Sequence, residues 1–158
     1  MISIKIDKDV RDKAIKDMKD FDAQKTYNKF TCSNNWTGLL GEMVLNNYFI
    51  SKQKEVKWFD FIKGSWKFPD FIYNEKTIDL KTRSGLGMWF TKPVFDIYIY
   101  ARLSKSGDYL YLISWITKEE MVEAMDNGKA KQVRWKNRND YVINEEDMNP
   151  IETLEVLQ

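Results

Sequence analysis

The chain contains no histidine and a single cysteine, Cys32. The absence of histidine excludes Ser-His-Asp triads, Cys-His dyads, histidine metal sites and histidine general bases. One cysteine cannot form an internal disulfide, which fits a reducing compartment. The residue types left for catalysis are Asp, Glu, Lys, Arg, Tyr, Ser and Thr. The carboxylates among them favour hard cations such as Mg²⁺ over zinc.

Long hydrophobic runs and a strong net charge are also lacking. No apolar run approaches the roughly 20 residues that a membrane span needs, and residues 1–5 lack the apolar stretch of a signal peptide. The 25 Lys and Arg residues nearly balance the 24 Asp and Glu residues, so nucleic-acid binding has to come from local basic clusters. We therefore expect a cytoplasmic protein without a membrane partner.

The composition and the residue patterns that are present predict one globular domain. Of the 158 residues, 43% are apolar and 15% aromatic, which predicts a single domain over 1–158 with a substantial core. The order of elements predicts an α/β (α+β) fold, with a central mixed β-sheet flanked by helices. Expected helices run from residue 7 or 9 to 24, from 35 or 37 to 50 and from 117 to 128, and expected strands cover 2–6, 57–62, 68–73, 77–81, 94–102, 109–115 and 141–143.

Three other segments carry weaker signals. Residues 82–93 contain two glycines and a proline and are expected to form a loop. Residues 129–140 are basic and polar, and residues 151–157 are expected to form a short helix or an extended tail. In the second helix, Gly38 and Gly41 lower the helix propensity, either for close packing against another element or for ligand space beside Glu42.

Residues 68–73 and 77–81 are predicted to pair as a β-hairpin. The turn is either the two residues Asn74-Glu75 or three residues including Lys76. The length of the turn decides which side chains of the two strands face each other, because side chains alternate between the two faces of a sheet.

With the two-residue turn, Asp70 lies opposite Asp79, and Lys81 lies on the same face. Directly opposed Cβ atoms are about 4.5–5.5 Å apart, so the two carboxylates would repel each other unless a divalent cation bound both. Lys81 can hold or deprotonate an attacking water, or neutralise charge on a phosphate. With the three-residue turn the carboxylates become diagonal neighbours. In both cases the residues suit metal-dependent cleavage of a phosphodiester.

The segments Pro69-Asp70 and Asp79-Leu80-Lys81 resemble the motif of the PD-(D/E)XK nuclease superfamily. Its members commonly add a glutamate from a preceding helix, and Glu42 in the segment 38–42 matches that role. The resemblance implies a restriction-endonuclease-like core that cleaves nucleic acid with Mg²⁺, for which Mn²⁺ can substitute. It also implies that Asp70 and Asp79 bind the cation, that Glu42 assists directly or through water, and that Lys81 positions the attacking water. Residues 115–120 and 149–152 also resemble small phage-encoded members.

Several basic residues outside the motif are candidates for contact with nucleic acid. If the strand that carries the motif continues, we expect Arg83 to face away from Lys81 and to be structural; if it ends there, Arg83 can clamp a phosphate. The basic segment 129–138, which includes Trp135, either follows a phosphate backbone or is a solvated loop. The contact candidates are Arg83, Lys67, Lys92, Arg134, Lys136 and Arg138.

The leading hypothesis is a Mg²⁺-dependent, phage-type DNA endonuclease. One alternative is a Holliday-junction resolvase or restriction-type endonuclease of the same superfamily, which would usually act as a homodimer. Another is a non-catalytic nucleic-acid-binding protein that keeps the fold. RNA stays open as a substrate, and the sequence does not distinguish single strands, duplexes and junctions.

Overall fold

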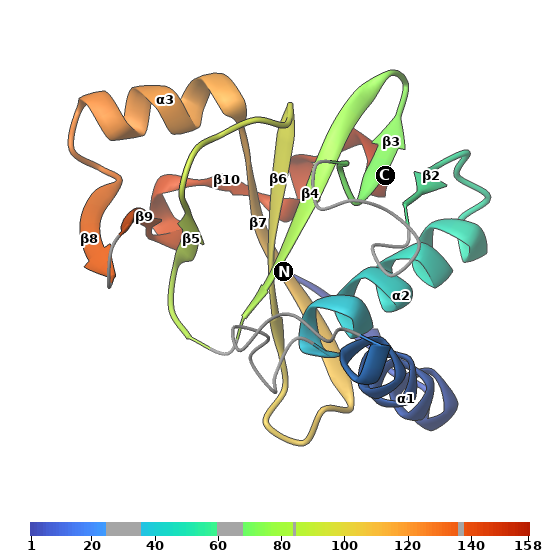
Figure 1. The fold of residues 1–158 in the computed structure, drawn as a ribbon. Helices are drawn as coiled ribbons and strands as arrows, with labels where there is room; N and C mark the ends of the chain where they lie inside the picture. The colour runs from blue at the N-terminus through green and yellow to red at the C-terminus, as the bar shows by residue number, and fades with distance from the viewer. Residues whose placement is uncertain (25–35, 60–67, 84, 136–137) are drawn as a thin grey trace.

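The computed structural model describes residues 1–24, 36–59, 68–83, 85–135 and 138–158. Within these residues the main feature is a mixed β-sheet, which confirms the expected α+β class. A smaller antiparallel sheet lies beside it (Figure 1). The strands of the main sheet are β1 (Ile2–Lys5), β2 (Lys57–Trp58), β3 (Phe71–Tyr73), β4 (Lys76–Arg83), β6 (Ile97–Leu103), β7 (Tyr109–Thr117) and β10 (Asn149–Pro150), and those of the smaller sheet are β5 (Met88–Phe90), β8 (Lys131–Trp135) and β9 (Arg138–Ile143).

The strand order of the main sheet is β1-β7-β6-β4-β3-β2, with β10 also paired to β7. Strands β4 and β6 are parallel, whereas the other neighbours are antiparallel. The smaller sheet has the order β5-β9-β8. The chain therefore places β4, which carries the motif, near the middle of the main sheet, paired with β3 on one side and β6 on the other.

Helices cover both faces of the main sheet (Figure 1). The helices α1 (Lys8–Gln24) and α2 (Trp36–Ser51) lie on one face, and α3 (Lys118–Asp126) lies with the smaller sheet on the other. Three short 3₁₀ helices follow: η1 (Glu145–Asp147), η2 (Ile151–Thr153) and η3 (Glu155–Leu157). No helix in the described part of the chain is both long enough and apolar enough to span a membrane.

The alternation of side chains along the central strands produces two separate cores. Ile78 and Leu80 of β4 pack with Leu39 and Leu40 of α2 in the larger core. Tyr98 and Tyr100 of β6 belong to the second core, which also contains residues of α3 and the smaller sheet. Because successive residues of a strand point to opposite faces, Asp79 and Lys81 project toward the side of the second core.

The hairpin formed by β3 and β4 has the two-residue turn. Phe71 pairs with Ile78 and Tyr73 with Lys76, so only Asn74 and Glu75 remain unpaired. Both turn residues have positive φ, 46° and 64°, as a type I′ turn requires. The prediction of a two-residue turn at these positions is confirmed, and the three-residue alternative is wrong.

The expected loop over residues 82–93 is wrong in two places. β4 continues through Arg83, and β5 spans Met88–Phe90. Gly87, directly before β5, has a φ of 77°, and a Cβ there would lie 2.9 Å from the carbonyl oxygen of Ile143. The glycine that indicated a loop therefore allows β5 to approach β9 closely.

Residues 129–140 also form more regular structure than a solvated loop. β8 and β9 pair antiparallel, with Lys131 opposite Val142 and Val133 opposite Asp140. The expected strand over 141–143 is the second half of β9, and the expected strand over 57–62 is described only as β2, because residues 60–67 lie outside the described residues.

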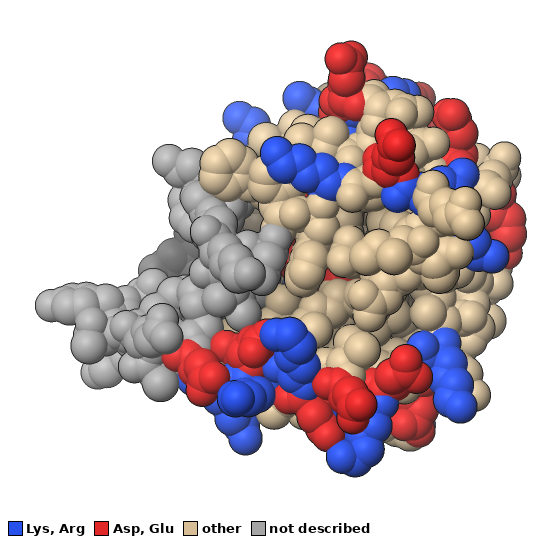
Figure 2. Space-filling model, turned by 90° about the vertical axis from the view of Figure 1, so that its right-hand side faces the viewer, with Lys and Arg blue, Asp and Glu red and all other residues tan. Residues whose placement is uncertain are grey.

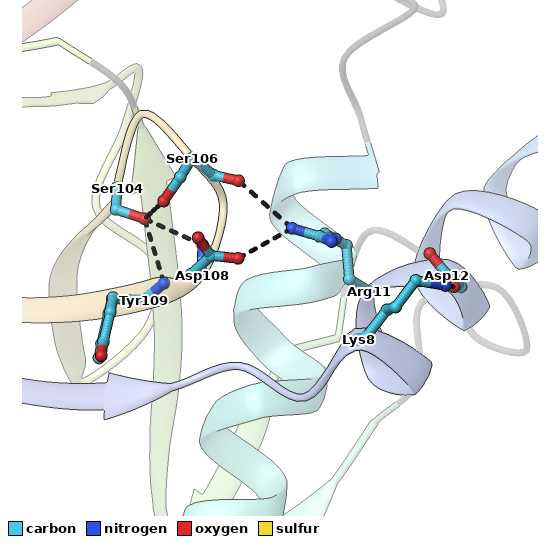
Figure 3. Close-up of polar contacts among 7 residues, drawn as sticks. All are labelled: Lys8, Arg11, Asp12, Ser104, Ser106, Asp108 and Tyr109. Atoms are coloured by element: carbon cyan, nitrogen blue, oxygen red, sulfur yellow. Dashed lines mark hydrogen bonds and ion pairs between the residues drawn. The ribbon is translucent and has the colours of Figure 1, made fainter.

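The N-terminal end of α1 is tied to the loop between β6 and β7 (Figure 3). Arg11 donates to the Asp108 carboxylate at 3.2 Å and to the Ser106 carbonyl at 3.3 Å. The hydroxyl oxygen of Ser104 accepts the backbone N–H groups of Asp108 and Tyr109, at 3.0 and 3.1 Å. These contacts fix α1, and the helix α2 packed on it, relative to the main sheet.

Figure 2 shows the face of the molecule formed by the helical layer of α1 and α2. Charged side chains follow its lower edge, where α1 lies, and uncharged side chains fill its centre. On α1, Lys8 is paired with Asp12 and Lys13 with Asp17, four residues apart. Among the residues drawn in colour, the basic side chains on this edge alternate with acidic ones and do not gather into a basic patch.

Candidate active site

Asp79 and Lys81 form an ion pair on the face of β4 that points toward the second core. The Lys81 Nζ lies 2.6 Å from Asp79 Oδ2. Asp79 is only 7% exposed, because its neighbour across the parallel pairing is the buried Tyr98. A strand holds residues i and i+2 on one face, so the sequence spacing alone determines that these two side chains meet.

Asp70 lies directly before β3, one residue ahead of the Phe71–Ile78 pair. Its Oδ2 accepts the backbone N–H of Leu80 at 2.6 Å, which brings the carboxyl group beside β4. Burial and the neighbouring charge of Asp79 together raise the pKa of Asp70 to about 7, against the lowering effects of the Leu80 N–H and of Lys81. The structure thus brings Asp70, Asp79 and Lys81 together, as the hairpin register predicts.

The ammonium group of Lys81 stays charged in this setting. Burial lowers the pKa of Lys81, but the carboxylates of Asp79 and Asp70 outweigh burial, so the pKa is raised above its usual value. A charged ammonium can neutralise a phosphate oxygen or hold a water by donating hydrogen bonds to it. It cannot accept a proton from that water.

Glu42 is a buried carboxylate on α2 and is 6% exposed. Its Oε2 accepts a hydrogen bond from Trp58 Nε1 at 3.3 Å. The helix α2 packs on the face of the sheet that carries Ile78 and Leu80, whereas Asp79 projects from the other face. In the described residues, no three His, Cys, Asp or Glu side chains form a group that could hold a metal.

Close packing explains one of the two glycines of α2. A Cβ on Gly41 would lie 2.1 Å from Thr82 Oγ1 on β4, whereas one on Gly38 would meet nothing within 4 Å. Gly41 therefore lets α2 approach β4 directly. Because Glu42 follows Gly41 on the helix, this contact also sets the position of Glu42 relative to β4.

A cavity of about 300 Å³ opens beside Asp79 and Lys81, and we call it the β4–β5 cavity. Arg83 lines it together with these two residues. The expectation that Arg83 faces away from Lys81 in a continuing strand is wrong, because residues two apart in a strand share a face. The cavity is lined by Asp79, Lys81, Arg83, Trp89, Phe90, Thr91, Lys92, Val94, Phe95, Tyr98 and Asp140.

Two predicted contact residues, Arg83 and Lys92, line this cavity. Arg134 is exposed on β8. Lys67 and Lys136 lie outside the described residues, as does the side chain of Arg138.

Sequence reasoning missed the aromatic and acidic residues of the cavity. Asp140 on β9 is 4% exposed, and its Oδ1 accepts a hydrogen bond from Thr91 Oγ1 at 3.0 Å. The hydroxyl oxygen of Tyr98 accepts the N–H groups of Val94 and Phe95, at 2.6 and 3.0 Å, and so holds the loop after β5 in place. The sequence offers one signal for Asp140, an acidic residue within an otherwise basic segment.

The pair Asp70 and Asp79 fits a hard divalent cation. Both groups offer carboxylate oxygens, which Mg²⁺ prefers. Asp79 Oδ2 is buried, and its contact is the ion pair with Lys81. Burial, and after it the charge of Asp79, raise the pKa of Asp70, and a bound cation would offset both effects.

Searches of family models, curated proteins and solved structures give no match to this chain.

Proposed function

We propose that this protein is a Mg²⁺-dependent nuclease that hydrolyses phosphodiester bonds, acting as a DNA endonuclease of the phage type. The observation that carries the proposal is the convergence of Asp70, Asp79 and Lys81 at the hairpin. Two carboxylates and an ammonium suit metal-dependent phosphodiester hydrolysis, and two of these three groups, Asp79 and Lys81, line a cavity. The resemblance of the same residues to the PD-(D/E)XK motif supports the assignment.

In this proposal Asp70 and Asp79 hold the cation, whereas Glu42, which α2 carries on the opposite face of the sheet from Asp79, does not hold it. When bound, Mg²⁺ polarises the phosphoryl oxygen and lowers the pKa of a bound water. Lys81 carries a positive charge beside the carboxylates, where it can donate hydrogen bonds to the attacking water and stabilise charge that develops on the phosphate. Arg83 and Lys92, at the exposed side of the cavity, attract the phosphates of the substrate.

The test is cleavage of labelled DNA and RNA by the wild-type protein and by Asp79→Ala, with Mg²⁺ and with EDTA. We expect Mg²⁺-dependent cleavage by the wild type and a loss of at least about 100-fold in Asp79→Ala, as for removal of other groups that stabilise transition-state charge. Asp126→Ala, which removes an exposed carboxylate on α3, is the matched control and should cleave normally.

Circular dichroism and thermal unfolding would establish that Asp79→Ala keeps the fold. Undiminished Mg²⁺-dependent cleavage by a folded Asp79→Ala protein contradicts the proposed site. Salt-sensitive binding of DNA by the wild type without cleavage in Mg²⁺ or Mn²⁺ would instead indicate a non-catalytic nucleic-acid-binding protein.

A further inference from the structure

In the β4–β5 cavity the exposed charged residues are cations and the buried ones are carboxylates. The cations Arg83 and Lys92 are exposed. The carboxylates Asp79 and Asp140 are 7% and 4% exposed, and the aromatic residues Phe90 and Tyr98 are buried as well. A negatively charged phosphate is therefore favoured at the exposed cations and disfavoured deeper in the cavity, next to the carboxylate of Asp140.

The interior of the cavity suits a nucleobase. Its aromatic residues are Trp89, Phe90, Phe95 and Tyr98, of which the half-buried Trp89 and Phe95 offer apolar ring surface and Phe90 and Tyr98 are buried behind it in the second core. Asp140, held by Thr91, offers a carboxylate that accepts hydrogen bonds. Adenine, cytosine and guanine carry amino groups that donate to a carboxylate. An unstacked base can therefore donate hydrogen bonds from its polar edge to the carboxylate and stack its π-face on an aromatic ring.

Arg83 and Trp89 form a ready stacking platform beside the motif. The guanidinium carbon of Arg83 lies 5.0 Å from the centre of the Trp89 ring, and Trp89 is half-buried. Bases in single strands commonly stack on aromatic rings and on arginine guanidinium planes. Arg83 is also two residues from Lys81 on the same face of β4, so a base on this platform lies next to the catalytic residues.

A base in a regular duplex cannot reach this interior, because it is paired and stacked between its neighbours. A cavity of about 300 Å³ that lies beside Asp79 and Lys81 can receive one nucleotide only if that nucleotide is unpaired. The β4–β5 cavity therefore favours unpaired over paired nucleotides, a difference that Asp70, Asp79 and Lys81 alone would not make.

We propose that the β4–β5 cavity binds an unpaired nucleotide adjacent to the scissile phosphate, so that the substrate is a single strand or an unpaired end or loop. This inference rests on the proposed nuclease function and names the substrate class of that same site. The base stacks on the Arg83–Trp89 platform and donates to Asp140, while its phosphate lies toward Lys81.

Binding measured without turnover tests the inference first. Asp79→Asn would be titrated against a labelled DNA single strand and the duplex of the same sequence, followed by fluorescence anisotropy. Trp89→Ala and Trp89→Phe would be introduced into this background. The matched control is Tyr48→Ala, because Tyr48 also lies beneath a cation, Lys52 at 5.5 Å, but on α2 and away from the cavity.

We expect tighter binding of the single strand than of the duplex. Trp89→Ala should weaken single-strand binding about tenfold or more, the range expected for loss of one base–aromatic stack, and Trp89→Phe should weaken it less. Tyr48→Ala should bind as the Asp79→Asn parent does. Equal or tighter binding of the duplex, or single-strand binding unchanged by Trp89→Ala in a folded protein, overturns the inference.

Cleavage assays separate this inference from the proposed function. If the wild type with Mg²⁺ cleaves a duplex as fast as a single strand, the inference fails and the nuclease function stands. If it cleaves neither DNA nor RNA in any of these forms, the nuclease function itself fails. Cleavage that is faster on single strands and slowed by Trp89→Ala supports both.

Discussion

Among the single residues of the site, Asp70 links pH to stability. Its pKa in the folded protein is raised to about 7 from 3.8, by burial and by the charge of Asp79. Between these two pH values the folded state binds more protons than the unfolded state, so raising the pH lowers the free energy of unfolding. A bound divalent cation would remove this penalty, because it stabilises the charged carboxylates.

We predict that the metal-free protein in EDTA loses stability as the pH rises from about 4 to 7, by an amount on the order of a few kcal/mol. Chemical denaturation at a series of pH values measures this loss. Asp70→Asn, which cannot ionise, should show a flatter profile over the same range. Equal slopes for the two proteins would mean that Asp70 does not titrate there.

Among the elements, α2 packs closely on β4 at the contact between Gly41 and Thr82. We predict that Gly41→Ala lowers the free energy of unfolding by about 1–3 kcal/mol, the usual cost of overpacking, because the new Cβ meets Thr82 Oγ1 at 2.1 Å. Gly38→Ala is the control, since a Cβ there meets nothing within 4 Å, and it should raise stability by up to about 1 kcal/mol. Urea denaturation measures both changes.

A second substitution checks the cause of the Gly41→Ala effect. Thr82→Ala removes the closest atom and leaves the Thr82 Cβ position at 3.1 Å from the new methyl group. The double variant should therefore recover part of the lost stability. If both single losses simply add, the contact does not explain the sensitivity of Gly41.

The sequence predicts the helices and strands that have a strong hydrophobic periodicity. It also predicts the pairing register of the hairpin of β3 and β4. The expected helix that begins at residue 117 is one example: Thr117 and Glu120 form a capping box at the start of α3. The short strand β5 does not follow, because its three residues lie between glycines and a proline that indicate a loop. β5 is stabilised by pairing with β9, a contact far away in the sequence.

The candidate site also combines features that local sequence predicts with features that depend on contacts between distant segments. The relation between Asp79 and Lys81 is local and follows from strand alternation. The cavity depends on tertiary contacts, since Asp140 arrives from β9, about 60 residues farther along the chain, through the pairing of β5 with β9. No local pattern around Asp140 shows that it lines the same cavity as Asp79.

At the scale of the whole molecule, the positive and negative charges nearly balance. Binding of nucleic acid therefore depends on places where basic side chains cluster or lack an acidic neighbour. β8 carries Arg134 in the smaller sheet, which also supplies Asp140 to the cavity. The α1 edge carries Lys13, which is paired with Asp17. A nucleic acid bound at the cavity should therefore extend over β8 rather than over α1.

We predict that Arg134→Ala weakens DNA binding and lowers the magnitude of the slope of log K against log salt concentration by about 0.7–0.9, the value for one lost phosphate contact. Lys13→Ala should leave this slope unchanged. Anisotropy titrations at several salt concentrations measure both. An unchanged slope for Arg134→Ala, or an equal drop for Lys13→Ala, would contradict this placement of the nucleic acid.

The two-residue turn at Asn74 and Glu75 shapes the candidate active site, although it lies at the far end of the hairpin. It determines which residues of β3 and β4 are opposed, and hence whether Asp70 reaches Asp79. A single inserted residue would slide one strand past the other and exchange the polar face for the apolar one. Substitutions in the turn can keep this register, whereas a change in its length would separate the carboxylates without altering either of them.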